Sequence, residues 1–590
     1  MTSRREFVQH LSLAVAAIPV AGIPAPVVKT GPALMKLPDP SAAMTTADIL
    51  VDKLIAWGVT MVFGLTGDGV IPFVEALRKR QDKIRYITVR HEESAAFMAS
   101  GYAKYTGKLG VCLATTGPGA VHLMNGLYDA AMEGAPVLAI TGVINHDLLG
   151  TQFTQEVDTV KMLDSVAIYN QEITGPVHAL TVVDLACRNA LTTPGVAHLT
   201  AATDVQSKPL SEDKHSKKGG HLTGAAGFTP RIDTPDEQEL DKAAELLNAG
   251  NKIVILAGRG SLGAAEEVGQ LADKLGAPVA KALLGKALLP DDSPFTTGGT
   301  GNLGTLPSKQ MMQECDTLLI LGSNMPHLEY YPDNATGIQI DRDPRRIGLR
   351  YPVTLGLHGD VRATVQALLP KIKTKTNRDF LKLAQQRMTG WRSLMTKLES
   401  DRSLPVKPPF LVAQMSRLIK QDAVVAIDTG AHTVFTARHW QVRTGQQLVV
   451  CGNLASMAPG LPYALAAQLA YPGRQCIAMV GDGSFTMLMG ELATAVMYKL
   501  PVKVIIFKNN ILAMDKFEQK DAGDPDYGIT LQPVDFAKIA EACGAEGYTC
   551  TKPEEVEPTL RRAFASSSPA VIQVTVDAEM APSPPDKLSL

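Results

Sequence analysis

The sequence predicts an α/β protein whose parallel sheets are divided among several doubly wound domains. Two observations support this fold class. Short apolar runs of strand length alternate with longer segments of helical periodicity along most of the chain, and this alternation is typical of parallel sheets covered by helices. The chain also has 590 residues, which is too long for one hydrophobic core and corresponds to three or four domains of ordinary size.

The composition excludes several classes of protein. Lys and Arg total 57, Asp and Glu total 59, and the two signs are interspersed, so neither a nucleic-acid partner nor a polybasic membrane surface is expected. The cysteines are odd in number and include no CxxC pair, which argues against a disulfide framework and a zinc site. We expect buried, inert thiols at all seven positions, which are Cys112, Cys187, Cys315, Cys451, Cys476, Cys543 and Cys550.

The N-terminal segment resembles a twin-arginine export signal. Arg4 and Arg5 precede an apolar stretch at 11–27 that three prolines interrupt. This stretch is short for a membrane span and fits the apolar region of a signal better. We expect residues 1–44 to be signal and linker, and the protein to be exported to the periplasm. The alternative is a cytoplasmic protein with a disordered tail and a chance Arg-Arg pair. No stable membrane span is expected elsewhere.

The first domain is expected at residues 45–206. Helix and strand patterns alternate from Thr45, and His91-Glu92-Glu93 opens a helical segment. A carboxylate in the first turn of a helix usually interacts favourably with the helix dipole, so this position alone assigns no chemical role to Glu92. Residues 207–232 are rich in Lys, Gly, Ser and His and are expected to form a linker.

The second domain is expected at residues 233–370. The apolar strand 252–257 is followed by Gly258-Arg259-Gly260-Ser261-Leu262-Gly263 and a helical segment. A GxGxxG in this context is a hint of a dinucleotide. It favours a nicotinamide cofactor only weakly, because Lys281 stands where an acid would bind the ribose. A simple glycine-rich turn is the alternative.

The third domain is expected at residues 405–580, after a helical connector at 376–400. The apolar strand 476–480 ends at Gly481-Asp482-Gly483, a helix is expected from Ser484 to about Tyr498, and a second strand ends near Asn509. Strands of a right-handed βαβ unit are parallel, so Asp482 and Asn509 should lie side by side at the carboxyl edge. The helix N-terminus suits a diphosphate, and the side-chain oxygens suit Mg2+. An ordinary βαβ crossover is the alternative.

Two long segments resemble one enzyme family. Residues 90–142 read RHEESAAFMASGYAKYTGKLGVCLATTGPGAVHLMNGLYDAAMEGAPVLAITG, and residues 481–510 read GDGSFTMLMGELATAVMYKLPVKVIIFKNN. Both are similar to the thiamine-diphosphate-dependent pyruvate oxidase and acetolactate synthase family, and the resemblance covers residues 45–580 in the expected order. It implies three α/β domains, which bind the pyrimidine of thiamine diphosphate, FAD and the diphosphate, respectively.

The resemblance also assigns roles to residues of the first and third domains. Glu92 matches the glutamate that hydrogen-bonds the aminopyrimidine and promotes proton removal from the thiazolium carbon. Asp482, Asn509 and the carbonyl of Ile511 match the magnesium ligands. Met457 matches a bulky residue that holds the cofactor in a bent shape, although Ala455 replaces a glycine of the family's Gly-Ser-Met segment. The implied contacts of thiamine diphosphate are Ser456, Met457, Gly481, Asp482, Gly483, Ser484, Asn509 and Ile511.

The middle segment resembles the FAD-binding domain of the same family, with bacterial pyruvate oxidases and quinone-linked pyruvate dehydrogenases as the nearest members. The similarity lies at four expected strand ends and in the Thr300-Gly301 pair. It implies a flavin extended across the strand ends with acids near its adenosine half, for which solvated loop acids are the alternative. The implied FAD contacts are Gly258, Arg259, Gly260, Thr300, Gly301, Gly322, Asp341 and Asp360.

Three further features are expected near the substrate or the cofactor. Gln155 matches a glutamine near the family's substrate pocket, although Thr154 stands where the family often has phenylalanine. Met514 follows the asparagine pair and is placed in the same pocket. Gly117-Pro118-Gly119 would be a turn near the cofactor, or simply a loop.

The resemblance implies decarboxylation of pyruvate or a related 2-oxo acid. Electron transfer to FAD would give acetate or acetyl phosphate, carboligation would give acetolactate, and protonation would give acetaldehyde. Acetolactate synthases usually have a tryptophan shortly after the asparagine pair, and none stands close after Asn510. We therefore favour the oxidase, with a quinone or oxygen as electron acceptor. An inactive cofactor-binding paralogue is the alternative from another class.

The same resemblance implies a homotetramer, or at least a dimer. In this assembly the pyrimidine-binding domain of one subunit and the diphosphate-binding domain of another would share each cofactor. Quinone-linked relatives have an additional amphipathic C-terminal segment that docks on membrane lipid, and the sequence after residue 580 does not match it. Lipid activation is therefore not expected.

Overall fold

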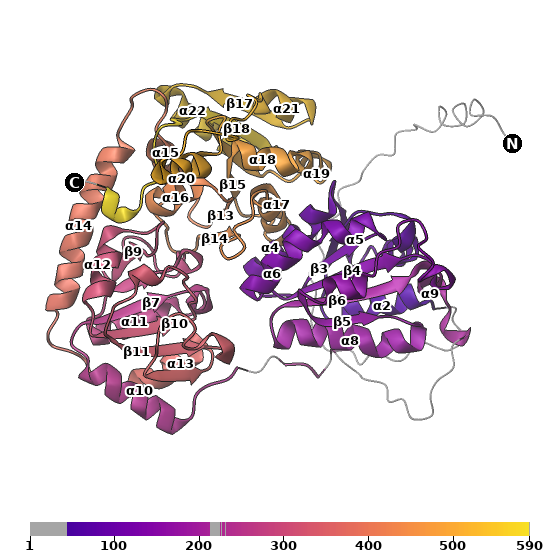
Figure 1. The fold of residues 1–590 in the computed structure, drawn as a ribbon, viewed down its shortest axis with the longest axis horizontal. Helices are drawn as coiled ribbons and strands as arrows, with labels where there is room; N and C mark the ends of the chain where they lie inside the picture. Colours follow the sequence, from indigo (N-terminus) through magenta and orange to yellow (C-terminus); the bar gives the residue numbers. More distant parts are fainter. Residues whose placement is uncertain (1–43, 213–224, 226, 230–231, 589–590) are drawn as a thin grey trace. The chain divides into compact units, whose positions relative to one another are not determined.

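Three parallel six-stranded sheets make up the part of the chain that the structure describes (Figure 1). The structure is a computed structural model, and the residues that it describes are 44–212, 225, 227–229 and 232–588. Apolar clusters with helices lie on both faces of each sheet, so the predicted α/β fold of three doubly wound domains is confirmed. The expected export signal, apart from residue 44, lies outside the described residues, as does much of the expected linker.

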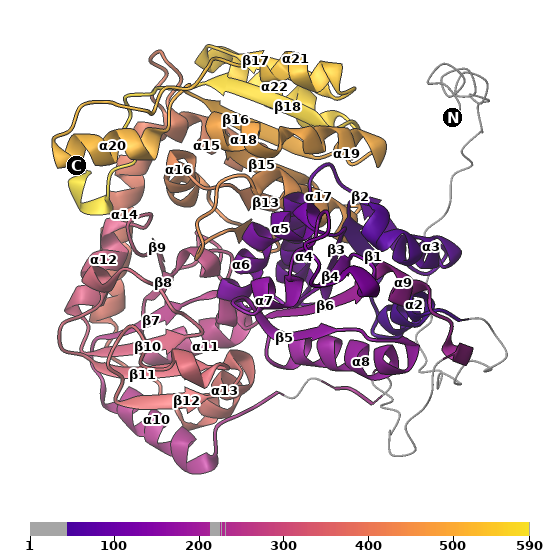
Figure 2. The ribbon, with the colours of Figure 1, turned by 45° about the vertical axis from the view of Figure 1, so that its right-hand side comes forward.

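The first sheet has the strand order β2-β1-β3-β4-β6-β5, which can be followed in Figure 2. Apolar residues of α4 (Glu92–Thr106) and α6 (Met124–Glu133) cover one face, and those of α2 (Thr46–Ala56), α3 (Ile71–Lys79) and α8 (Pro176–Thr192) cover the other. The strands are β1 (Met61–Gly64), β2 (Arg85–Thr88), β3 (Gly110–Ala114), β4 (Val137–Val143), β5 (Ala167–Glu172) and β6 (Val196–Ala202). The shorter helices are α5 (Pro118–His122), α7 (Thr159–Leu163) and α9 (Thr203–Ser207).

The middle sheet has the order β12-β11-β10-β7-β8-β9. Its helix α10 (Glu237–Ala249) begins with a capping box, in which Asp236 accepts from the Glu239 amide at 2.9 Å and Glu239 accepts from the Asp236 amide at 3.0 Å. The strands are β7 (Ile253–Ala257), β8 (Val279–Lys281), β9 (Thr296–Gly299), β10 (Thr317–Leu321), β11 (Thr336–Asp341) and β12 (Leu355–His358). The other helices are α11 (Ala265–Leu275), α12 (Leu306–Glu314) and α13 (Val361–Leu368).

The third sheet has the order β14-β13-β15-β16-β18-β17 and follows the connector helix α14 (Asp379–Glu399). Its central strands are buried almost throughout, as parallel strands covered on both faces must be. The strands are β13 (Val424–Ile427), β14 (Gln447–Val450), β15 (Cys476–Gly481), β16 (Lys503–Lys508), β17 (Glu546–Cys550) and β18 (Ala570–Thr575). The helices are α15 (Pro408–Leu418), α16 (Ala431–His439), α17 (Gly460–Ala470), α18 (Asp482–Leu488), α19 (Leu492–Met497), α20 (Ala513–Ala522), α21 (Phe536–Ala542) and α22 (Pro553–Ala565).

Two segments differ from the sequence-based expectation. The helix expected from Ser484 to about Tyr498 is divided, because a 3-10 turn at Met489–Glu491 separates α18 from α19. The GxGxxG does not open an α-helix directly either. A 3-10 turn at Arg259–Ser261 follows β7, and α11 begins only at Ala265.

The cysteines are all free, and six of the seven are buried, while Cys543 is half-buried. Burial raises the pKa of the Cys112 thiol to about 12, which keeps it protonated at neutral pH. Inert thiols were expected at these positions, and burial of six of them agrees with that. Among the described residues, no helix combines the length and the apolar character that a membrane crossing requires.

Candidate active site

Asp482 and Asn509 lie side by side at the carboxyl edge of the third sheet. Strands β15 and β16 pair in parallel, with Gly481 opposite Phe507. The Asp482 carboxylate accepts from the backbone amides of Asn509 at 3.0 Å, Asn510 at 2.6 Å and Gly483 at 2.9 Å. Burial raises the pKa of Asp482, and these three hydrogen bonds oppose that effect. The strand ends therefore present a carboxylate and an amide oxygen together, as the motif predicts.

The backbone after β16 turns sharply and brings Ile511 to the same edge. Asn510 has a φ of 56°, and Ile511 donates its amide to the Asn509 side-chain oxygen at 3.2 Å. An amide oxygen has two lone pairs, so Asn509 retains one for another partner. Asp482, Asn509 and Ile511 thus offer the kinds of oxygen ligand that Mg2+ prefers.

Asp428, at the end of β13, organises the neighbouring loop and was not identified from the sequence. Its buried carboxylate accepts from the amides of Thr429 at 2.7 Å, Ala458 at 3.0 Å and Gly460 at 2.9 Å. The Ala458 amide also reaches the Ser484 hydroxyl at 2.9 Å. Asp428 therefore connects the loop before α17 to the turn that opens α18. An acid directly after the apolar strand Ala423–Ile427 was the available sequence signal.

Met457 lies in this loop and contacts the turn at the end of β15. Its Cε is 3.7 Å from the position that a Cβ at Gly483 would occupy. The loop is held in an unusual conformation, with φ values of 55° at Ala455 and 94° at Ala458. Ser456 donates its hydroxyl to the Met457 carbonyl at 2.9 Å. These contacts place the Met457 side chain beside the Gly481–Ser484 turn, where the positioning role was expected.

His432 is a second residue that sequence reasoning missed at this edge. It lies in the first turn of α16, and its buried Nε2 has no hydrogen-bond partner among the described residues. Burial lowers the pKa of His432 to about 3, so the ring is neutral. A Cβ at Gly481 would lie 3.0 Å from the His432 ring. A buried imidazole with an unpaired nitrogen, on a ring whose Nδ1 edge lies beside the Gly481 turn, fits a polar ligand such as a diphosphate at this helix N-terminus.

The carboxyl group of Glu92 lies at the start of α4, close to the Gly117-Pro118-Gly119 turn. Its Oε2 is 2.9 Å from Nδ1 of His122, which ends α5. Its Oε1 is only 3.0 Å from the position of a Cβ at Gly119, so a larger residue there would collide with the carboxyl group. Ligand atoms of His91, Glu92 and His122 all lie within 4.8 Å of one another. The turn therefore forms part of the immediate surroundings of Glu92.

Residues near Glu92 contact the third domain within the same chain. The amides of Arg90 and His91 donate to Oε1 of Glu491 at 2.9 and 3.2 Å. Asn125 donates its side-chain amide to Glu93 at 2.6 Å and to Ser456 at 2.8 Å. The start of α4 is thereby attached to the 3-10 turn after α18 and to the Met457 loop. Sharing of a cofactor between subunits stays a prediction.

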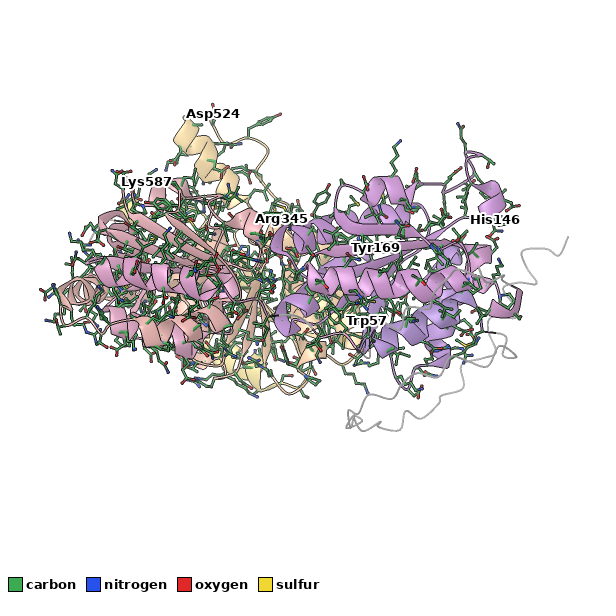
Figure 3. All side chains as sticks on the ribbon, turned by 90° about the horizontal axis from the view of Figure 1, so that it is seen from below. Trp57, His146, Tyr169, Arg345, Asp524 and Lys587 are labelled. Carbon is green, nitrogen blue, oxygen red and sulfur yellow. The ribbon has the colours of Figure 1, made fainter. Side chains whose placement is uncertain are left out.

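The two residues expected in the substrate pocket lie on different elements. Gln155 accepts from the Thr116 hydroxyl at 3.2 Å, and its carbonyl is 2.7 Å from a Cβ position at Gly117. It therefore packs against the turn that faces Glu92. Met514 is half-buried in the first turn of α20, a helix without a fully buried residue. Asp524 follows the end of this helix and projects outward in Figure 3.

The strand ends of the middle sheet are the place where a second site was expected. Strands β7, β10 and β11 are neighbours, so Gly258, Gly322 and Asp341 lie at one edge. A Cβ at Gly258 would lie 2.6 Å from Ser323, whose buried hydroxyl has no hydrogen-bond partner among the described residues. Asp341 is buried and accepts from the Asp343 amide at 2.9 Å. An unpaired hydroxyl beside close backbones fits a polar ligand such as FAD.

Other residues proposed for this second site already have partners within the protein. Arg259 donates to the Glu133 carbonyl at 2.7 Å and contacts the Glu133 carboxylate at 3.4 Å. Asp360 caps α13 by accepting from the Ala363 amide at 3.0 Å. Thr300 is buried, with its hydroxyl 3.3 Å from the Met312 sulfur. Gly260 and Gly322 pack backbone against backbone, and Gly301 packs against His327.

Comparison with known proteins gives matches to all three domains. The thiamine pyrophosphate (that is, thiamine diphosphate) enzyme profiles match as the N-terminal TPP binding domain at residues 44–162, the central domain at 240–368 and the C-terminal TPP binding domain at 428–574. The Bacillus subtilis protein YdaP, whose name describes it as thiamine pyrophosphate-containing, is 39% identical over 91% of this chain and 92% of its own length. The pyruvate oxidase of Lactiplantibacillus plantarum is 29% identical, over 92% and 90%. The acetolactate synthase large subunit of Porphyra purpurea is 30% identical, over 89% and 91%.

Proposed function

We propose that this chain, which belongs to the thiamine pyrophosphate enzyme family, decarboxylates pyruvate or a related 2-oxo acid oxidatively. The reaction would use thiamine diphosphate, Mg2+ and FAD, and would give acetate or acetyl phosphate. When bound, thiamine diphosphate supplies the electron sink for decarboxylation, and FAD supplies the two-electron acceptor. The acceptor that reoxidises FAD would be a quinone or oxygen.

The observation that carries the decarboxylase part is the set of oxygens and nitrogens at the carboxyl edge of the third sheet. Asp482, Asn509 and the Ile511 carbonyl would hold Mg2+, and the buried His432 ring would lie beside the diphosphate at the Gly481 turn. Met457 would keep the two rings of the cofactor close together. These residues would bind and orient the cofactor, so they would contribute to its position.

Glu92 has the chemical role in this proposal. Its buried carboxyl group would hold a proton at the aminopyrimidine, so that the amino group can accept the proton of the thiazolium carbon. Burial excludes water from this proton and strengthens its hydrogen bond. The carboxyl group is fixed by the start of α4 and the Gly117–Gly119 turn, both of which belong to one domain.

The middle domain supports FAD as a cofactor, and the missing tryptophan after Asn510 supports oxidation over carboligation. The Ser323 hydroxyl has no partner among the described residues, and Gly258 and Gly322 follow strands β7 and β10. Both features suit a second extended cofactor. No tryptophan follows closely after Asn510, and the tryptophans are Trp57, Trp391 and Trp440. Carboligation is the second candidate, because acetolactate synthases at 29–30% identity are as similar as the pyruvate oxidase.

An anaerobic absorbance titration with pyruvate tests the proposal. The protein is purified with its flavin and titrated with and without thiamine diphosphate and Mg2+. We expect the flavin bands to bleach only when both are present, and Glu92→Gln to bleach much more slowly. A flavin that stays oxidised while pyruvate is consumed would assign the chain to the carboligases if acetolactate accumulates, or to the non-oxidative decarboxylases if acetaldehyde does. Binding of the cofactor without release of carbon dioxide from any 2-oxo acid would indicate an inactive paralogue.

Export through the twin-arginine route and assembly into a homotetramer also belong to this proposal. The Arg4-Arg5 pair and the apolar stretch after it support export. The name of the pyruvate oxidase relative supports a small substrate, and the homotetramer rests on the family resemblance. Fractionation of cells that produce the full chain, compared with an Arg4→Lys, Arg5→Lys variant, tests export. Sedimentation of the purified protein tests the oligomer, and a monomer at working concentration would contradict it.

A further inference from the structure

The carboxyl group of Glu92 has two oxygens in different surroundings. Oε2 is 2.9 Å from Nδ1 of His122. Among the hydrogen bonds of the described residues, none reaches Oε1, which lies 3.0 Å from the position that a Cβ at Gly119 would occupy. The residue that approaches Oε2 therefore decides which oxygen remains for another partner.

We propose that His122 is a positioning residue for Glu92. Its Nδ1–H donates to Oε2, and this leaves Oε1 as the oxygen that holds the proton shared with the aminopyrimidine. The inference rests on the proposed function, because it assumes that Glu92 serves thiamine diphosphate. It adds a residue that neither the motif comparison nor the proposed mechanism includes.

The direction of this hydrogen bond follows from the chemistry of the two groups. When the Glu92 carboxylate is ionised it only accepts, so the 2.9 Å contact then requires the proton to be on Nδ1. When the carboxyl group carries its proton on Oε1, Oε2 can still accept from the same donor. The Nδ1–H tautomer therefore supports both protonation states of Glu92 without a rearrangement, whereas the other tautomer would draw the proton to Oε2.

The surroundings hold the His122 ring in place and connect it to solvent. His91 stacks on it, with ring centroids 4.3 Å apart and planes inclined by 27°. The Glu93 amide donates to His91 Nδ1 at 3.2 Å, which fixes the His91 tautomer with its proton on Nε2. The His122 side chain is 42% exposed, whereas that of Glu92 is 7% exposed. His122 is thus a polar bridge between a buried carboxyl group and water.

The sequence explains why His122 reaches this position. Gly117 has a φ of 57° and is the N-cap of the five-residue helix α5, which ends at His122. Gly119 lies in that helix directly against Glu92. Gly119 therefore avoids a collision with Oε1, and His122 at the other end of the same helix reaches Oε2.

The test compares substitutions that retain or remove the donor. His122→Asn keeps an N–H close to the position of Nδ1, His122→Gln moves it to the position of Nε2, and His122→Leu removes it. His146→Leu is the matched control, because it breaks an exposed His–Asp pair elsewhere in the first domain. The readout is hydrogen–deuterium exchange at the thiazolium carbon of enzyme-bound thiamine diphosphate, which needs no substrate or flavin. Cofactor affinity is measured separately by calorimetry.

We expect exchange to slow by about 10- to 100-fold in His122→Leu, as loss of a hydrogen bond to a charged group implies. His122→Gln should behave like His122→Leu. His122→Asn should stay within about threefold of the unmodified enzyme, and His146→Leu should not change the rate. Unchanged exchange in His122→Leu would overturn the inference. If Glu92→Gln also exchanges normally, the proposed function fails as well, so the two failures are distinguishable.

A second measurement uses the unmodified protein without cofactor, and a variant is needed only to assign its spectrum. Nitrogen-15 NMR of the unmodified protein labelled at histidine reports which ring nitrogen of His122 carries the proton. We expect the Nδ1–H form, with the His122 resonances assigned by their absence in His122→Asn. An Nε2–H form would overturn the inference. Two histidines and a carboxylate can also bind Zn2+, so the spectrum is recorded with a chelator, and Nδ1–H signals that appear only after metal removal would point to a metal ligand instead.

Discussion

Asp428 shows how one side chain can shape a strand-end loop. Its carboxylate accepts three backbone amides from two segments and is fully enclosed. Burial raises the pKa of Asp428 to about 6, although hydrogen bonds from Ser484 and the amides act in the opposite direction. The folded protein therefore binds a proton at this site more readily than the unfolded chain does.

This raised pKa predicts how stability depends on pH. Because the folded-state value lies above the unfolded one of 3.8, the contribution of Asp428 to stability is fully present below pH 4 and is lost as pH rises through 6. The difference corresponds to about 3 kcal/mol. In Asp428→Asn, the decrease in the free energy of unfolding that Asp428 causes between pH 4 and 6 should disappear. The variant should be less stable overall, because its side-chain amide would face the Gly460 amide. Urea unfolding of both proteins across this pH range checks this prediction. An equal pH dependence of the free energy of unfolding in the two proteins would contradict it.

Ala455 gives a prediction of the opposite kind, since its substitution should stabilise the protein. Its φ of 55° lies in the left-handed region, and the residue is exposed. Removing the Cβ relieves about 1 kcal/mol of strain, part of which is offset by the greater entropy of glycine in the unfolded chain. Ala455→Gly should therefore raise the free energy of unfolding slightly, whereas Ala470→Gly, at the last residue of helix α17, should lower it by less than about 1 kcal/mol. A loss in both variants would show that Ala455 is not strained.

At the scale of elements, the 3-10 turn between α18 and α19 attaches the first domain to the third. Glu491 in this turn is buried and accepts from the amides of Arg90 and His91, while Thr494 donates to its other oxygen at 2.6 Å. Both amides directly precede Glu92. The turn that interrupts the expected helix is therefore the element that fixes the start of α4.

Substitution of Glu491 should weaken this attachment. Glu491→Ala leaves two amides without their acceptor, and we expect a loss of about 1–3 kcal/mol in the free energy of unfolding. Glu491→Gln keeps one acceptor oxygen and should lose less. Hydrogen exchange of the Arg90 and His91 amides localises the effect, and both amides should exchange faster in Glu491→Ala. If their protection is unchanged, the contact with Glu491 does not hold the start of α4.

The sequence predicts elements that follow local rules and misses those that depend on distant partners. The proximity of Asp482 and Asn509 could be predicted, because a βαβ unit places the ends of its two parallel strands next to each other whatever surrounds them. The division of the helix after Leu488 could not be predicted, because it accompanies a contact of Glu491 with residues about 400 positions earlier. The local signal was weak and consisted of Gly490 and Glu491, which interrupt the apolar residues of this segment.

The candidate site shows the same division. Glu92 and Met457 were found through the family resemblance, since neither a helix-start acid nor a buried methionine indicates chemistry alone. His432 and Asp428 follow a strand end by one to five residues and could have been proposed from that position. Arg259 was expected at FAD, and its observed partner, Glu133, lies 126 positions away in another domain. Such partners depend on how the domains pack, which local patterns do not describe.

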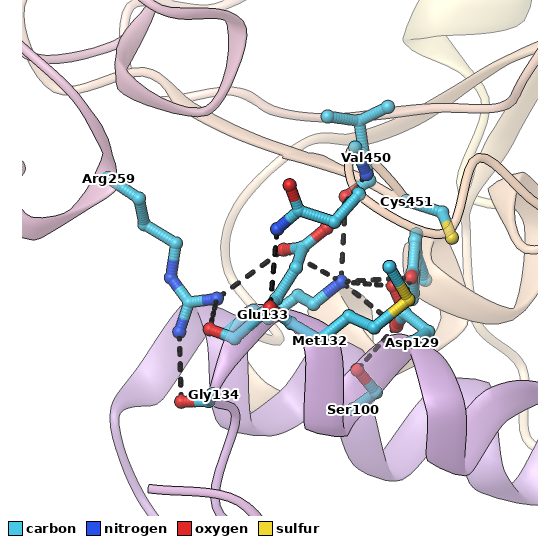
Figure 4. A network of polar contacts seen from close by, with 12 residues as sticks. Ser100, Asp129, Met132, Glu133, Gly134, Arg259, Val450 and Cys451 are labelled. Atoms are coloured by element: carbon cyan, nitrogen blue, oxygen red, sulfur yellow. Dashed lines mark hydrogen bonds and ion pairs between the residues drawn. The ribbon is translucent and has the colours of Figure 1, made fainter. Parts of the chain in front are cut away.

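At the scale of the whole molecule, a buried ionic network joins residues of all three domains (Figure 4). Lys104 lies 2.7 Å from Asp129 and 3.1 Å from Glu133, and the three side chains are at most 3% exposed. Glu133 accepts from the Gly452 amide at 2.7 Å and contacts Arg259 at 3.4 Å. Two cations and two carboxylates balance one another, so each buried charge has a partner.

The pKa values within the network indicate that the charges persist. Burial alone would lower the pKa of Lys104, but Asp129 and Glu133 outweigh it and raise that pKa above its ordinary value. Burial alone would raise the pKa of Asp129, but Lys104 and the hydrogen bonds from Ser100 and Tyr463 hold it below its ordinary value. Both groups are therefore ionised at neutral pH, and removal of one leaves its partner charged and buried.

Lys104→Met should consequently destabilise the whole molecule. Asp129 and Glu133 would lose their shared cation, and we expect a loss of about 3–5 kcal/mol in the free energy of unfolding. Lys382→Met is the matched control, because its partner Asp379 and Lys382 itself are mostly exposed, and it should change stability by less than about 0.5 kcal/mol. Calorimetry should also show unfolding in more than one step for Lys104→Met, since the network connects the three domains. Similar melting of the two variants would mean that the domains are held together by apolar packing, such as that between α4 and α17, and that the network adds little.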